Sequence, residues 1–138
     1  MLATALVGVL TAIAVPTYRS SVERVKLQHA RADLALIHTA VLASRGANFR
    51  LPDSLSAVRG VPLIDPWGRP YAYYYFDKPD ANRGQIRKDH NLVPINSEFD
   101  LYSAGKNGTS RPPLTAAPSR DDIVVGRDGA FIGLATEF

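Results

Sequence analysis

A loop in the last third of the chain carries side-chain oxygens that could bind a hard metal ion. Calcium takes six or more oxygen ligands from carboxylates, amide side chains and backbone carbonyls, and glycines in such a loop let the carbonyls point inward. Three prolines between residues 109 and 120 would bring later aspartates back toward earlier ones. We therefore predict a calcium site here; a metal-free loop held by Asx-type turns and salt bridges is the alternative. The predicted ligands are Asp100, Asn107, Thr109, Asp121 and Asp122.

No other group of residues in the sequence has the spacing of a catalytic centre. The three histidines, His29, His38 and His90, do not have the spacing of metal ligands. Phosphate-binding glycine loops, nucleophile elbows and paired catalytic carboxylates do not stand out either. The sequence contains no cysteine, which excludes disulfides and thiolate metal sites. We therefore expect that the protein is not an enzyme.

The composition predicts one compact domain with an extension. A chain of 138 residues with 46% hydrophobic content can bury one core but not two. In the first third of the chain only Gly8, Pro16 and Gly46 interrupt a helical pattern, whereas most glycines and prolines follow residue 48. The net charge is +3, and Lys and Arg are spread along the chain. This distribution is typical of a solvated surface and not of a nucleic-acid patch.

The first fifteen residues contain no charged side chain. As a helix this run would reach roughly 22 Å, which is short of the ~30 Å hydrocarbon core of a membrane. A secretory signal peptide would carry basic residues before the run and a cleavage site after it, and neither is present. A core helix that is apolar all round needs a larger protein to cover it. We therefore interpret residues 1–15 as part of a helix that lies in a membrane or in the core of a filament.

The helical pattern continues beyond Pro16 and becomes amphipathic. Apolar side chains recur there at spacings of three and four, which predicts one buried stripe. The helix is predicted to end at about Ser44, with Gly46 just past its end. Pro16 removes one backbone hydrogen bond, so we expect a kink or local melting at that position. The stripe consists of Leu27, Ala30, Leu34, Ile37 and Val41.

The second part of the chain predicts short strands between turns. Residues 65–71 contain two prolines and a glycine, so we expect an irregular loop in which Trp67 anchors the chain on the helix and Asp65 caps the turn. A short helix is expected over residues 51–58 and a mobile loop over residues 78–91. Strand-forming residues predict strands at 71–76 and 98–103, and a hairpin formed by 121–125 and 129–132 around a Gly-Arg-Asp-Gly turn.

Together these elements predict an α+β fold. A long N-terminal helix over residues 1–45 packs on a small antiparallel β-sheet, and a loop region belongs to the C-terminal part. The helix begins with the membrane or filament-core segment described above. Residues 46–138 form the globular head.

Three motifs follow one another along the chain and resemble one family. Residues 8–18 read Gly-Val-Leu-Thr-Ala-Ile-Ala-Val-Pro-Thr-Tyr, residues 65–71 read Asp-Pro-Trp-Gly-Arg-Pro-Tyr, and residues 99–108 read Phe-Asp-Leu-Tyr-Ser-Ala-Gly-Lys-Asn-Gly. The first is similar to the N-terminal helix of type IV pilins and type II secretion pseudopilins. The second and third are similar to segments of the major pseudopilins. The resemblance covers most of the chain.

The resemblance implies a pilin-like fold and a structural function. The chain would be a pseudopilin of a periplasmic type II secretion filament, assembled from the bacterial inner membrane to move secreted proteins. It would cross that membrane once, with its head in the periplasm, and would contact copies of itself, other pseudopilins and the inner-membrane assembly platform. The family's leader and its Phe-Thr-Leu-Ile-Glu stretch precede the matching positions. We expect Met1 to be an internal start, with the leader and about six mature residues preceding it, since these restore the length of a span.

The resemblance also implies calcium in the loop, because the matching loop of the pseudopilins binds it. Asp100 matches a ligand aspartate, and Thr109 fits a serine position. Asn107 stands where an aspartate is usual, and Arg111 where an acidic residue is expected. The lower negative charge predicts weaker calcium binding, and the guanidinium of Arg111 is an alternative to the ion.

Two other functions compete with the filament subunit. A minor type IV pilin could adhere to a surface or to DNA through basic side chains, and steep salt dependence of DNA binding would favour it. An ordinary soluble domain with a buried helix would be a monomer without detergent. Nucleic acid is not expected as a partner of the leading candidate. The basic residues of the minor-pilin alternative are Arg83, Arg87, Lys88 and Arg111.

Overall fold

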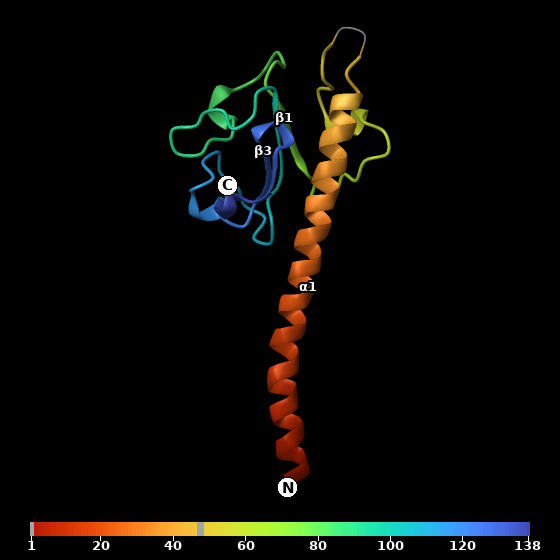
Figure 1. The fold of residues 1–138 in the computed structure, drawn as a ribbon, viewed down its shortest axis with the longest axis vertical. Helices are drawn as coiled ribbons and strands as arrows, with labels where there is room; N and C mark the ends of the chain where they lie inside the picture. Colours follow the sequence, from red (N-terminus) through yellow and green to blue (C-terminus); the bar gives the residue numbers. More distant parts are fainter. Residues whose placement is uncertain (1, 47–48) are drawn as a thin grey trace.

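The computed structural model describes residues 2–46 and 49–138 and shows an α+β fold, as predicted. Its long helix, α1 (Leu2–Ala43), precedes a four-stranded antiparallel sheet. In Figure 1 the upper half of α1 runs beside the sheet, while the lower half extends away from it toward the N-terminus. Met1, the predicted internal start, lies outside the described residues. The strands are neighbours in chain order: β1 (Ala72–Tyr75), β2 (Phe99–Ser103), β3 (Ile123–Gly126) and β4 (Phe131–Leu134).

Helix α1 is continuous through Pro16, so the predicted local melting is wrong. A proline inside a helix removes the hydrogen bond to the carbonyl four residues earlier, and the bonds on either side of it are sufficient here to keep the helix intact. The predicted stripe is confirmed: Ala30, Leu34, Ile37 and Val41 are fully buried against the sheet, and Leu27 is packed at its edge. The helix ends one residue before the predicted position.

The sheet has two covered faces. Along β2, alternate side chains point to opposite sides. Phe99 and Leu101 join the core that α1 covers, together with Ile123 and Val125. Tyr102 belongs to a second cluster on the other face, where Ile95, Leu114, Val124 and Ala135 are buried under the loops. The loops after β1 and β2 therefore pack on the sheet and form part of its core.

The strand predictions are confirmed, but the short helix predicted over residues 51–58 needs correction. Residues 51–58 form only a short 3₁₀ turn at Leu55–Ala57, because the backbone at Ser54 is extended, with φ −151° and ψ 156°. Leu51, Leu55 and Val58 are nevertheless all buried in the core. The loop over residues 78–91 contains a second 3₁₀ turn, Arg83–Gln85, and its next part is held against the sheet. Arg87 in this segment is 2% exposed, so the segment does not extend outward as a whole. The other 3₁₀ turns are Ala117–Ser119, Arg127–Gly129 and Ala135–Glu137.

Candidate functional site

The N-terminal half of α1 exposes apolar side chains. All described side chains between residues 7 and 21 are exposed, including Val9, Val15 and Tyr18 at 60%, 49% and 71%. Large exposed apolar surfaces are rare on soluble monomers. Within the described residues, no helix combines the length and the apolarity that crossing a membrane requires. We call residues 7–21 of α1 the projecting segment.

The turn at residues 65–69 lies where α1 enters the head. The Asp65 carboxylate accepts hydrogen bonds from the backbone N–H groups of Trp67 and Arg69, at 3.0 and 2.9 Å. Its other oxygen accepts a 2.6 Å hydrogen bond from the Ser103 hydroxyl on β2. Gly68 has a φ of 85°, which other residues adopt only at a cost. The prediction that Asp65 caps this turn is confirmed, and the cap ties the turn to the sheet.

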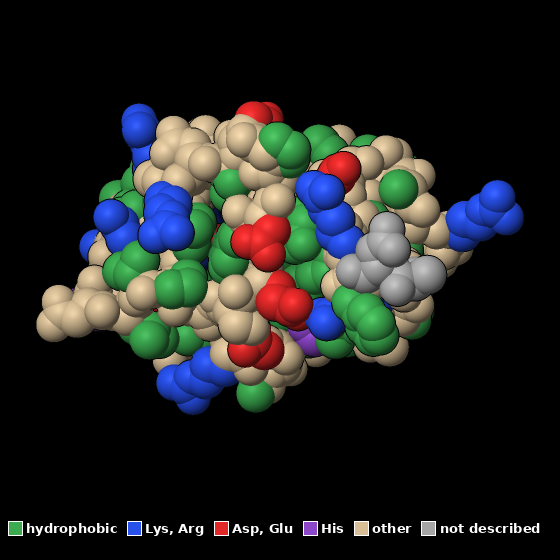
Figure 2. Space-filling view, turned by 90° about the horizontal axis from the view of Figure 1, so that it is seen from above, with side chains coloured by type: hydrophobic (Ala, Val, Ile, Leu, Met, Phe, Trp, Pro, Cys, Tyr) green, Lys and Arg blue, Asp and Glu red, His purple; other side chains and the backbone are tan. Residues whose placement is uncertain are grey.

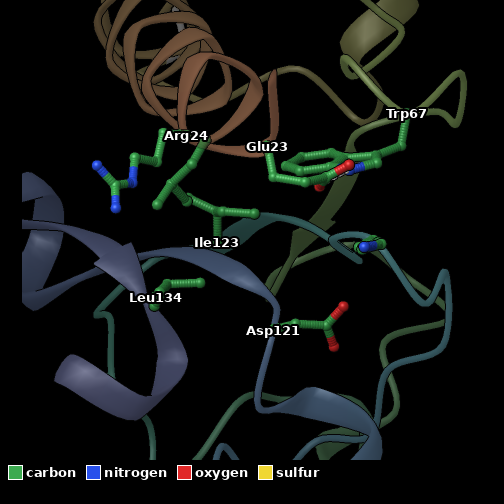
Figure 3. A pocket seen from close by; sticks show the side chains of 8 residues that line it. Glu23, Arg24, Trp67, Asp121, Ile123 and Leu134 are labelled. Carbon is green, nitrogen blue, oxygen red and sulfur yellow. Dashed lines mark hydrogen bonds between the residues drawn. The ribbon is translucent and has the colours of Figure 1, made fainter. Parts of the chain in front are cut away.

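Trp67 anchors the turn on α1, as predicted. Its indole Nε1 donates a 3.1 Å hydrogen bond to the Glu23 carboxylate, and its ring packs against the core that α1 covers. Figure 3 shows the indole beside Glu23, with Ile123 and Leu134 on the opposite wall of a groove between the helix and the sheet. The groove has a volume of about 300 Å³, and its helix wall is formed by Glu23, Arg24 and Leu27.

Three of the five predicted calcium ligands lie together in the loop between β2 and β3. Asp121 accepts hydrogen bonds from the backbone N–H and from the side-chain amide of Asn107. The Asn107 side-chain carbonyl accepts hydrogen bonds from the backbone and the hydroxyl of Thr109, at 2.7 and 3.0 Å. These are Asx-type contacts that close the loop on itself.

The other two predicted ligands meet Arg87 on the second face of the sheet. The backbone N–H of Arg87 donates a 2.6 Å hydrogen bond to Asp100, and its guanidinium donates one of 2.6 Å to Asp122. The Asn96 amide donates to the other oxygen of Asp100 at 3.1 Å. Burial raises the pKa of both aspartates from the ordinary carboxyl value, while Arg87 opposes that increase in both. The Ser110 hydroxyl, which donates to Asp122, also opposes it.

The five predicted calcium ligands fall into two separate groups of hydrogen bonds. Across residues 2–46 and 49–138, no three acidic, histidine or cysteine side chains come together as metal ligands do. Most of the carboxylate oxygens of Asp100, Asp121 and Asp122 accept hydrogen bonds from protein donors. The exception is Asp122 Oδ1, which is buried without a hydrogen-bond donor. Calcium takes six or more oxygen ligands. The calcium site stays a prediction, and the contacts of these residues are those of the metal-free alternative.

Two arginines hold this loop: Arg87 was predicted only as a possible DNA contact, and no role was predicted for Arg69. Arg69 donates hydrogen bonds to the backbone carbonyls of Gly105 and Lys106, at 2.6 and 3.1 Å, and Arg87 is described above. The predicted alternative to a calcium ion in the loop was the guanidinium of Arg111, but Arg111 is exposed. Arg87 lies in a polar segment and has no motif around it, so only its three-dimensional contacts identify it.

The basic residues of the DNA-binding alternative are not all on the surface. Arg87 is buried and therefore leaves the set that could contact a nucleic acid. Figure 2 shows the end of the head away from the N-terminus, where Lys and Arg side chains are scattered around the face and acidic ones lie between them. On this face, mixed charge is the observed pattern, as the composition predicts.

The histidines have separate surroundings. His29 lies 3.6 Å from Asp33 on the exposed side of α1. His38 packs beside Phe99, with ring centroids 5.5 Å apart, and burial lowers its pKa from 6.5 while nearby Asp128 opposes the decrease. His90 is exposed beside Asp89. None of these environments pairs a histidine with a nucleophile among the described residues.

The chain was compared with known proteins at three levels. Family models, curated proteins and solved structures gave no match to it.

Proposed function

We propose that the protein is a structural subunit that assembles into a filament through the projecting segment of α1. The observation that carries this proposal is the exposure of apolar side chains along a helix that extends beyond its own domain. Such a helix is unfavourable in water and favourable between copies of itself or among lipid tails.

The driving force is the burial of these side chains. Complete burial of one valine-sized side chain contributes about 1.5–3 kcal/mol. Several such contacts per subunit, repeated in a helical array, offset the entropy lost on association. Helix packing of this kind places the heads on the outside, because α1 enters the head only from about Glu23 onward. The head then forms the outer surface of the filament.

The finer assignment follows from the three motifs. A pseudopilin of a type II secretion filament, held in the bacterial inner membrane by its helix and exposing its head to the periplasm, has this division between an apolar rod and a polar head. Its partners would be further copies, other pseudopilins and the inner-membrane assembly platform. Two of the motifs lie in the head: one is the Asp65–Trp67 turn at the helix junction, and the other includes the start of the loop held by Arg69 and Arg87.

A pair of charged substitutions tests the assembly surface. Val15→Asp places a charge in the projecting segment, whereas Leu92→Asp places the same charge at a half-exposed apolar position on the head. After removal of detergent from the full chain, we expect the wild type and Leu92→Asp to sediment as large assemblies. Val15→Asp should remain small, because a buried unpaired charge costs several kcal/mol at each contact.

Two results would contradict the proposal. If Val15→Asp assembles like the wild type, this part of α1 is not the contact surface. If the wild type is a monodisperse monomer without detergent, the chain is an ordinary soluble domain. DNA binding that weakens steeply with salt would instead support the minor type IV pilin, and substitution of Arg83 and Arg111 should then weaken it.

A further inference from the structure

Arg87 connects three segments that are far apart in the chain. Its backbone N–H donates to Asp100 on β2, and its guanidinium donates to Asp122, immediately before β3. The same guanidinium donates a 2.8 Å hydrogen bond to the backbone carbonyl of Arg111 and another to the Ser110 hydroxyl. A carboxylate, a hydroxyl and a carbonyl therefore converge on one cationic group.

These oxygens are of the kinds that a bound calcium ion collects. A guanidinium is satisfied by fewer oxygen acceptors than a calcium ion, because its N–H donors form a planar fork that fits a carboxylate and adjacent acceptors. The group also lies over the ring of Tyr102, 4.3 Å from its centroid, which adds a cation–π contact on the side without acceptors. The charge of Asp122 is thus balanced by a cation that belongs to the chain.

We propose that Arg87 replaces calcium as the cation that orders the loop between β2 and β3. The loop is then stable without a metal ion. A second cation next to this guanidinium would be repelled in a buried environment of low dielectric constant, so calcium binding and the observed position of Arg87 oppose each other.

Arg69 supports the same loop at its other end. Its guanidinium donates to the carbonyls of Gly105 and Lys106, and a Cβ at Gly108 would lie 2.3 Å from its Nε atom. Backbone carbonyls at the start of a glycine-rich loop are further oxygens of the kind that calcium takes. An arginine thus holds each end of the loop, with the contact between Asn107 and Asp121 between them.

The test measures thermal unfolding of the full chain in detergent, with a chelator and with millimolar calcium. We expect the melting temperature of the wild type to be the same in both. Arg87→Met should lower it by roughly 10 °C or more, because Asp122 then stays buried without its partner. Arg83→Met, which removes an exposed arginine from the same segment, is the matched control and should leave it unchanged.

Further variants keep the test decisive if Arg87→Met does not fold. Asp122→Asn removes the charge that Arg87 balances. The variant that combines Arg87→Met with Asp122→Asn should therefore lose less stability than the sum of the losses in the two single variants. Arg87→Lys keeps the charge without the fork and should melt between the wild type and Arg87→Met. The proposal is overturned if chelation lowers the melting temperature of the wild type and calcium restores it. It is also overturned if the two single losses are additive.

Discussion

The projecting segment of α1 and the loop around Arg87 are unusual in opposite ways. The first exposes apolar side chains to the surroundings, and the second buries a guanidinium and two carboxylates within the head. Either arrangement is unfavourable by itself. The loop satisfies its charges through contacts inside the same chain, whereas the segment has its nearest core contacts only where α1 reaches the head. The comparison separates a head whose buried charges are paired within the chain from a helix segment whose described apolar side chains are exposed.

The largest effect should come from comparing the two halves of α1 directly. Ile37→Ala removes a fully buried side chain and should lower the free energy of unfolding by about 2–5 kcal/mol. Val15→Ala removes a half-exposed one and should change it by no more than about 0.5 kcal/mol, while weakening assembly. Urea unfolding followed by fluorescence of the single tryptophan measures both. Equal losses from the two variants would show that the halves do not differ as described.

A smaller effect tests how closely the loop fits its arginines. Gly108→Ala and Gly60→Ala both place a Cβ on a backbone with positive φ, 70° and 74°. Gly60 has open space around it, so its variant should lose only the conformational term of about 1–2 kcal/mol. At Gly108 the new Cβ must also displace Arg69, which should add about 1–2 kcal/mol. Urea titrations that give the same loss for both would mean that Arg69 does not hold the loop.

The smallest effect concerns pH and the contact between α1 and the hairpin turn. Burial lowers the pKa of His38, so the unfolded chain binds a proton there more readily than the folded chain does. The contribution of His38 to the free energy of unfolding is therefore fully present when the pH is above 6.5, the ordinary pKa of histidine. It is lost as the pH falls below that value. His38→Gln should have a shallower decrease in melting temperature than the wild type between about pH 8 and about pH 5.5. Parallel curves would exclude a contribution from His38.

The sequence predicts the elements that depend on local periodicity. The stripe from Leu27 to Val41 and the strands follow from apolar spacing, and the Asp65 cap and the Trp67 anchor follow from turn chemistry. Long-range polar contacts were not predictable in this way. Arg87 and Asp122 are 35 residues apart, and no periodic pattern links a buried arginine to its partner.

The loop shows why the site is harder to predict than the fold. In the structure Asp122 accepts a hydrogen bond from a guanidinium and Asp100 accepts one from a backbone N–H. The pattern of aspartates in a glycine-containing segment indicates cation binding. It does not identify the source of the charge. A metal ion and an arginine side chain satisfy the same oxygens, and the sequence places the arginine outside the loop.

The most direct measurement of the central claim uses the absence of native cysteine. Val15→Cys and Leu92→Cys allow one spin label each, on the projecting segment and on the head. On assembly after detergent removal, the label at position 15 should lose mobility and show spin–spin broadening, while the label at position 92 stays mobile. A label at position 15 that remains as mobile as the one at position 92 in the assembled protein would contradict the account.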